Sequence, residues 1–108
     1  IADQLPLDVI EFAPLAMNWL ERANKKGREM LLRRVKRLAE GKRSYALSKR
    51  LQNTQNPIYE AKLRGQRILW TKLKRGDTLS ILVWCVSHHD DVPGYLQKID
   101  QAFSRLSN

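Results

Sequence analysis

The sequence predicts an α+β fold in which a helical hairpin and a C-terminal helix pack against a small antiparallel β-sheet. One observation is that apolar residues recur at helical spacing near both ends of the chain. A second is the segment 58–86, where runs of β-branched and aromatic residues are separated by "RGQ" and "KRGDT". The length of 108 residues suits one compact domain and is too short for two. We therefore expect the order β-α-α-β-β-β-α in a single domain over 1–108, with its core at about 7–106.

The first expected elements are a short strand and a helix. The run "LDVIEF", residues 7–12, alternates between apolar and polar residues, and Pro14 after it suits the first turn of a helix. We expect this helix to extend from about Pro14 to Asn24. Its core-facing stripe at helical spacing comprises Leu15, Ala16, Trp19, Leu20 and Ala23.

A second helix is expected from about Arg28 to Glu40, with Gly41 as its C-terminal stop. Its inward residues are Leu31, Val35 and Leu38. Its outer side carries a dense basic stripe of Arg33, Arg34, Lys36 and Arg37. Such a stripe is commonly no more than a solvated helix face, and the alternative is a surface that binds an anionic partner.

The polar run "GKRSYALSKRLQNTQNP" predicts a connecting loop before the sheet. Three hairpin-linked strands are then expected at about 58–64, 67–73 and 79–86. The last of them is nearly all apolar, so it should be central in the sheet. Pro93 and Gly94 open a final helix. Its expected buried side comprises Tyr95, Leu96, Ile99, Ala102, Phe103 and Leu106.

Charge is the strongest compositional feature. The chain has 20 Lys and Arg against 11 Asp and Glu, a formal net charge of +9 and a pI near 10.1. This excess favours a polyanionic partner, chiefly nucleic acid, although an acidic protein or an anionic lipid surface would also fit.

The chain shows no sign of a membrane, disulfide or cofactor site. No apolar run approaches the roughly 18 residues of a membrane span, and no signal peptide opens the chain, so we expect a cytoplasmic protein without a membrane partner. Cys85 is the one cysteine, which excludes an internal disulfide and leaves too few ligands for a zinc site. We expect no cofactor. The first residue is Ile1 rather than Met, which is compatible with a piece of a longer protein.

Cations are threaded through the expected strands. Strand alternation places Lys62 and Arg64 on the same side as Glu60, and Arg67 opens the next strand across a tight turn. These cations either are ordinary exposed residues of a sheet or converge on an anion, for which a phosphate backbone is the commonest choice. Further candidates for contacts to nucleic acid are Lys49, Arg50, Lys72, Lys74 and the stripe on the second helix.

The run His88-His89-Asp90-Asp91 follows the last strand. Adjacent histidines point to opposite sides of an extended chain, so we expect no shared metal site. A His-Asp pair suits proton transfer, and the simpler alternative is a polar loop whose aspartates interact favourably with the dipole of the next helix.

The sequence contains no Gly-rich phosphate loop, no nucleophile elbow and no carboxylate cluster with metal-ligand spacing. If the chain is an enzyme, its candidate groups are cations, a histidine and a tyrosine. Metal-free RNA cleavage suits such a set, because a base activates the ribose 2′-OH and cations stabilise the phosphorane. Trp19, Trp70 and Trp84 are expected mainly in the core, with Trp70 the alternative candidate for stacking on a base.

Three phrases, in this order, resemble the RelE/ParE superfamily of bacterial toxins. "IEFAPLAMNWLERANKKGREMLLRRVKRLAEGKR" resembles its strand and helical hairpin, and "SKRLQNTQNPIYEAKLRGQRILWTKL" is similar to its first sheet strands. "LVWCVSHHDDVPGYLQKI" resembles its last strand and the turn into a C-terminal helix. The resemblance covers about residues 7–106 and implies the RelE-like order of elements given above.

The resemblance implies three alternative functions. RelE-type members are ribonucleases that cut mRNA at the ribosome, which would make Lys62, Arg64, Arg67, His89 and Tyr95 the catalytic candidates. ParE-type members act on DNA gyrase, and RelE-like domains attached to UvrD-like helicases are accessory modules. A toxin would also imply an antitoxin protein as partner. In the family an arginine often follows the last strand, whereas a histidine stands there in this chain.

Overall fold

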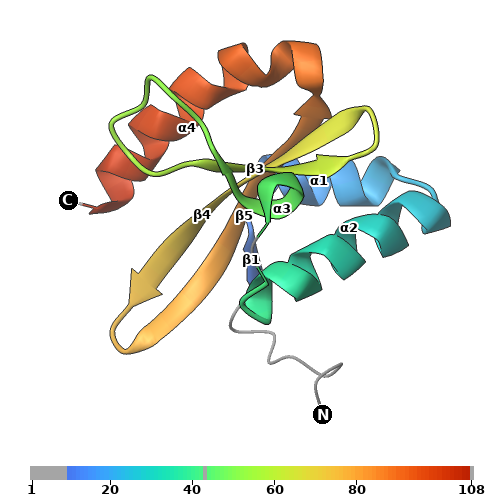
Figure 1. Cartoon of the computed structure of the whole chain (residues 1–108), viewed down its shortest axis with the longest axis horizontal. Coiled ribbons are helices and arrows are strands. Elements are labelled where there is room, and N and C mark those ends of the chain that lie inside the picture. Colours follow the sequence, from blue (N-terminus) through green and yellow to red (C-terminus); the bar gives the residue numbers. More distant parts are fainter. Residues whose placement is uncertain (1–9, 43, 108) are drawn as a thin grey trace.

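A mixed sheet of five strands runs through the middle of the molecule (Figure 1). The computed structural model describes residues 10–42 and 44–107. The spatial order of the strands is β1-β5-β4-β3-β2. Their bounds are β1 Ile10–Phe12, β2 Lys49–Arg50, β3 Tyr59–Leu63, β4 Gln66–Arg75 and β5 Thr78–His88. Strands β2 to β5 pair in antiparallel fashion, and β1 pairs with β5 in parallel.

Helices cover both faces of this sheet (Figure 1). On one face lie α1 (Pro14–Arg22), α2 (Lys25–Ala39) and the short α3 (Tyr45–Ser48). On the other lies α4 (Val92–Ser107), which follows the 3₁₀ turn η2 (His89–Asp91). The α+β class and the C-terminal helix predicted from the sequence are thereby confirmed. Within the described ranges, the helices are too short or too polar to cross a membrane.

Strand β5 is an interior strand covered on both faces, as its apolar sequence predicts, although β4 rather than β5 is the middle strand of the five. Ile81, Val83 and Val86 pack into the core beneath α1 and α2. Cys85 belongs to the second core, beneath α4. The register against β4 shifts after Leu69, so that Leu69 pairs with Cys85 and Trp70 with Val83. This irregularity leaves Trp84 as an extra residue that packs on the α4 side.

The helical hairpin departs slightly from the expected boundaries. Helix α2 begins at Lys25 rather than near Arg28, because the Asn24 side chain accepts a hydrogen bond of 2.8 Å from the Gly27 N–H and caps the helix. Leu31, Val35 and Leu38 are buried as predicted. Gly41 follows the helix with a φ of +87°, a left-handed conformation that glycine adopts without penalty, so its role as a C-terminal stop is confirmed.

The sheet is mixed rather than wholly antiparallel. The described part of the N-terminal strand is Ile10–Phe12, and it runs beside β5 in the same direction. Parallel neighbours require a crossover connection, and the intervening helices and strands provide it. The remainder of the expected strand, residues 7–9, lies outside the described residues. The segment expected to be a loop contains both α3 and the edge strand β2.

Two residues expected in the core are exposed instead. Leu15 is 50% exposed and lies at one margin of the α1 stripe, whereas Leu106 is 55% exposed and lies in the last turn of α4. Helix α1 buries Ala16, and α4 buries Leu96, Ile99 and Phe103. Periodicity therefore identified the correct face of each helix but overestimated the width of the buried stripe in α1 and its length in α4.

The Asp100 carboxylate accepts several of the hydrogen bonds that fasten the loop after β2 to α4. Asp100 accepts hydrogen bonds from the backbone N–H groups of Gln55 (2.9 Å) and Asn56 (3.0 Å). The Asn56 amide also donates to an oxygen of this carboxylate at 2.7 Å. Burial acts to raise the pKa of Asp100, but these hydrogen bonds and the nearby charge of Arg50 outweigh it and lower the pKa below 3.8.

We predict that Asp100→Asn lowers the free energy of unfolding by about 1 kcal/mol at neutral pH, because an ionised acceptor of several hydrogen bonds is lost. A depressed pKa contributes stability above the ordinary value of 3.8 and loses it as the pH falls through the folded-state value. The variant should therefore lose less stability than the parent when the pH is lowered below about 4. Urea unfolding at several pH values measures this. Asp91→Asn, at an exposed aspartate, is the matched control, and an equal effect there would contradict the assignment.

Candidate nucleic-acid interface

The outer side of α2 borders three adjoining hollows, which together we call the α2 groove. All three share Met30. Lys26 and Arg64 line both the first and the second hollow, and Arg33 lines both the second and the third. The cations along the groove are Arg22, Lys25, Lys26, Arg33, Arg34, Arg37 and Arg64. Among the described residues that line it, Glu29 is the one acid.

Helical spacing explains which members of the predicted stripe reach the groove. Arg33, Arg34 and Arg37 follow Met30 at three, four and seven residues, so their side chains share one face of α2. Lys36 falls between the groove and the core and lines none of the three hollows. The stripe predicted from the sequence is therefore divided, because three of its four cations line the groove and Lys36 does not.

Arg64 joins the groove because β3 ends one residue before it. Strand alternation predicted that Arg64 would share a face with Lys62. Arg64 instead has a φ of +58°, a turn conformation, and its side chain lines the hollows beside Lys26 and Met30. The alternation argument was wrong here, because it holds only while the chain stays extended. The Arg64 side chain therefore lies beside α2 and not on the sheet face where it was expected.

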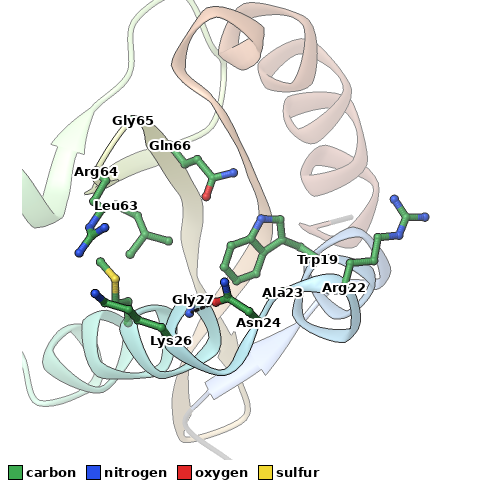
Figure 2. A pocket seen from close by; sticks show the side chains of 11 residues that line it. Trp19, Arg22, Ala23, Asn24, Lys26, Gly27, Leu63, Arg64, Gly65 and Gln66 are labelled. Atoms are coloured by element: carbon green, nitrogen blue, oxygen red, sulfur yellow. Dashed lines mark hydrogen bonds between the residues drawn. The ribbon is translucent and has the colours of Figure 1, made fainter.

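The first hollow differs from the rest of the groove, and we call it the Trp19 pocket (Figure 2). It encloses about 390 Å³ between the α1–α2 connection and the β3–β4 turn. Trp19, Leu63 and Gln66 point toward its centre, whereas Arg22 extends away from it (Figure 2). Lys26 lies beside Arg64 at the opposite rim. The pocket therefore combines an aromatic wall, an amide and a cationic rim.

Arg67 is a structural ion-pair residue in this conformation. Its Nε lies 2.9 Å from a carboxylate oxygen of Glu60, and the two side chains are 18% and 11% exposed. Its Nη1 donates to the backbone carbonyls of Arg64 and Gln66, each at 2.9 Å. Since Glu60 is almost buried, the guanidinium compensates a carboxylate that water cannot solvate. An anionic ligand would have to compete with Glu60 for this charge.

Lys62 stands directly opposite Arg67 in the β3–β4 register and is exposed. Its ammonium lies 5.3 Å from the ring centroid of Tyr45, and that of Lys49 lies 5.6 Å from the same ring. Tyr45 is 67% exposed, so it holds the two lysines at the surface through cation–π contacts. The predicted proximity of Lys62 and Arg67 is confirmed, and Lys49 is an additional neighbour.

The remaining predicted cations are separated. Arg50 donates from Nη1 to the backbone carbonyl of Leu51 and to Thr54 Oγ1, so it braces its own loop. Lys72 and Lys74 are exposed in the half of β4 remote from Gln66, which lines the Trp19 pocket at the other end of that strand. The structure therefore gathers the helical cations and Arg64, and does not gather all of the cations predicted from the sequence.

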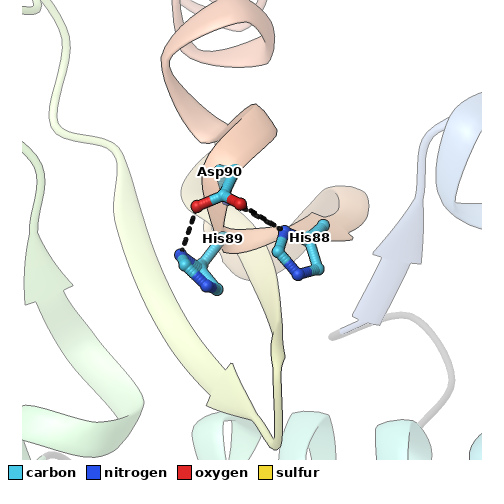
Figure 3. Close-up of side chains that lie close together, drawn as sticks. All are labelled: His88, His89 and Asp90. Atoms are coloured by element: carbon cyan, nitrogen blue, oxygen red, sulfur yellow. Dashed lines mark hydrogen bonds and ion pairs between the residues drawn. The ribbon is translucent and has the colours of Figure 1, made fainter.

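The two histidines converge on one carboxylate, contrary to the expectation that they point to opposite sides (Figure 3). His88 Nδ1 and His89 Nδ1 lie 3.4 Å and 2.9 Å from the two oxygens of Asp90. The rings are 4.4 Å apart because the chain leaves the extended conformation at η2. Together they offer three potential metal ligands whose donor atoms lie within 4.8 Å of one another.

All three of these side chains are exposed, and the Asp90 N–H already donates to His88 Nδ1 at 3.2 Å. A metal ion would have to displace that hydrogen bond and compete with water. The simpler role is a cap on the turn that leads into α4. His89 also donates its backbone N–H to Gly65 O at 3.4 Å, which places it beside the β3–β4 turn.

Tyr95 lines a hollow that the other catalytic candidates do not line. It is half-buried against the α4-side core and lines a hollow with Trp19, Arg22 and Cys85. None of Lys62, Arg64, Arg67 or His89, all of them described residues, lines that hollow.

Burial raises the pKa of the Cys85 thiol to about 12, so this cysteine stays protonated and unreactive.

Sequence reasoning overlooked the contribution of α1 to this surface. Trp19 was expected in the core, and it is half-buried with part of its surface in the pocket. Trp70, the candidate for base stacking, is fully buried and donates its indole N–H to Leu47 O at 3.0 Å. Trp19 reaches a surface hollow because the helical hairpin meets the β3–β4 turn beside it, whereas Trp70 lies within the sheet core.

No protein-family model matches the chain, and no curated protein matches it.

We predict that Arg67→Leu lowers the free energy of unfolding by about 2–3 kcal/mol, because it leaves the Glu60 carboxylate buried without its partner. The double variant Glu60→Leu/Arg67→Leu should recover most of this loss, since it removes both charges. Urea unfolding of the two single variants and the double variant forms a cycle that isolates the pair. Strictly additive losses would contradict the proposed coupling.

Proposed function

We propose that this chain is a nucleic-acid-binding domain and that the α2 groove is its binding surface. The observation that carries the proposal is the continuity of three hollows lined by cations from α1, α2 and the β3–β4 turn. From Lys26 to Arg37 the helix rises by about 16 Å, which is long enough to follow several successive phosphates. The net charge of +9 supports a polyanionic partner over a small anion.

The identity of the surface residues supports this partner. Arginine guanidinium groups donate bidentate hydrogen bonds to phosphate oxygens, and the groove holds several of them on one helix face. Met30 lies within all three hollows and supplies an apolar contact beneath the ligand. We place this function in the cytoplasm, with RNA as the favoured nucleic acid. Binding without cleavage is the role that the RelE/ParE resemblance implies for accessory domains of larger proteins such as helicases.

A second candidate is a metal-independent ribonuclease of the RelE type. It is favoured by the direct pairing of Lys62 with Arg67 and by the position of His89 beside the β3–β4 turn. In this version a base accepts the proton of the ribose 2′-OH, whose oxygen attacks the adjacent phosphorus. Lys62 and Arg67 then stabilise the phosphorane, and an acid protonates the departing 5′-oxygen. His89 would serve as one of these proton-transfer groups, and release of Arg67 from Glu60 would be required.

We predict that Arg33→Ala/Arg37→Ala weakens binding to RNA and flattens its salt dependence. The slope of log affinity against log salt should decrease by about 0.7–0.9 for each phosphate contact that is lost. Fluorescence anisotropy with a labelled RNA at several salt concentrations measures both effects. The control is Lys98→Ala, which removes an exposed cation from α4 on the other side of the sheet. If the parent protein binds without any salt dependence, or if both variants behave alike, the groove is not the binding surface.

For the ribonuclease candidate, we predict that Lys62→Ala and His89→Ala each reduce cleavage of mRNA on translating ribosomes by at least about 100-fold, the usual effect of losing a group that transfers a proton or stabilises charge. These residues are better tests than Arg67, because they are exposed and their removal leaves no buried charge. Primer extension on free and ribosome-bound mRNA reports the cleavage. Absence of cleavage by the parent protein, or full activity of both variants, would eliminate this candidate.

A further inference from the structure

The Trp19 pocket is built for a different chemical group than the rest of the α2 groove. The second and third hollows are lined almost entirely by charged residues around Met30. The Trp19 pocket instead has apolar walls from Trp19, Leu63 and Met30. Cations lie at its rim rather than in its centre (Figure 2). A phosphate alone would leave these apolar walls uncovered, so the pocket suits a ligand with both a flat apolar part and a phosphate.

The indole of Trp19 is a firmly supported wall. It packs against the core on one side, and its Cη2 atom lies close to Gly27 on α2. A β-carbon at Gly27 would be 3.7 Å from that indole atom, an ordinary van der Waals distance, so the ring lies against the first turn of the helix. A rigid, half-exposed aromatic ring offers a stacking platform without the cost of ordering it.

Polar groups in the pocket can read the edge of a flat ring. The Gln66 side chain points toward the middle of the pocket and carries both a donor and an acceptor (Figure 2). The Asn24 side-chain oxygen caps α2, and its NH₂ group remains as a second hydrogen-bond donor for a ligand in the pocket. Nucleobases present donors and acceptors on their edges and a π-face for stacking, and they are attached to phosphates that match the cationic rim.

We propose that the Trp19 pocket binds one unpaired base of a single-stranded nucleic acid, with the base stacked on Trp19 and the adjacent phosphate held by Lys26 and Arg64. This proposal rests on the proposed nucleic-acid-binding function and specifies its substrate as single-stranded. At about 390 Å³ the pocket lies toward the small end of the range of about 300–1,000 Å³ for ligand sites, so it holds a nucleotide and not a duplex. A base within a duplex would first have to be unpaired and unstacked, which costs a few kcal/mol.

The test compares a short fluorescein-labelled single-stranded RNA, its DNA equivalent, and each strand annealed to its complement. Fluorescence anisotropy should show that the parent protein binds the single strands more tightly than the duplexes. Trp19→Ala should weaken single-strand binding by about 5- to 100-fold, the effect of losing one base–aromatic stack of about 1–3 kcal/mol, and should leave duplex binding unchanged. Arg33→Ala/Arg37→Ala should weaken binding to single strands and duplexes alike, because it removes only phosphate contacts.

A second pair of variants guards against a loss of folding in Trp19→Ala. We expect RNA to quench the tryptophan fluorescence of the parent protein. Trp19→Phe keeps an aromatic ring, so it should retain most of the affinity while losing most of this quenching. Gln66→Ala removes the edge contact without altering the indole, and should weaken only single-strand binding. Thermal unfolding of each variant verifies that it is folded.

The outcomes separate this proposal from the function on which it rests. If the parent protein binds neither single strands nor duplexes, the nucleic-acid-binding function itself is wrong. If the parent protein binds both equally, and folded Trp19→Ala and Gln66→Ala variants bind like the parent, the groove binds phosphates but the pocket does not take a base. A preference for the RNA strand over the DNA strand would indicate that the ribose 2′-OH is also contacted.

Discussion

Burial of β5 on both faces is the constraint on which the other parts of the structure depend. An apolar strand covered on both sides needs a neighbour along each edge and a helical layer over each face. Strands β4 and β1 pair with the two edges of β5. Helices α1 and α2 cover one face, and α4 covers the other. Because α1 and α2 must lie flat on this strand, the connection between them meets the β3–β4 turn, where the Trp19 pocket forms.

A small domain with a large positive charge also has to manage repulsion between its cations. Part of the charge is used internally, since Arg67 compensates the nearly buried Glu60 and Arg50 braces the loop that follows β2. Lys49 and Lys62 lie against the ring of Tyr45. The cations along α2 remain concentrated on one surface with Glu29 as their one acidic neighbour among the described lining residues. Such a concentration of like charges costs stability through mutual repulsion, which a bound polyanion would relieve.

The division of roles among the arginines bears on the choice between binding and cleavage. A cation that stabilises a transition state has to be available when charge develops on the phosphorus. Arg67 is engaged by Glu60 and by two backbone carbonyls, and Tyr95 lines a hollow that none of Lys62, Arg64, Arg67 and His89 lines. The α2 groove needs no such rearrangement before it can accept phosphates, and for this reason binding is the function that the geometry favours.

The sequence by itself determined the α+β class, the core face of each main helix, the burial of β5 on both faces and the excess of positive charge. These features follow from local periodicity and composition, which act over a few residues. Tertiary structure alone decided that β1 is parallel to β5, that Arg64 turns toward α2, and that Trp19 rather than Trp70 reaches a surface hollow. It also decided that Arg67 pairs with Glu60 and that the two histidines meet at Asp90. The physical reason is that a charge or a ring acquires its partner from the register between strands and the packing of distant segments, which no local pattern encodes.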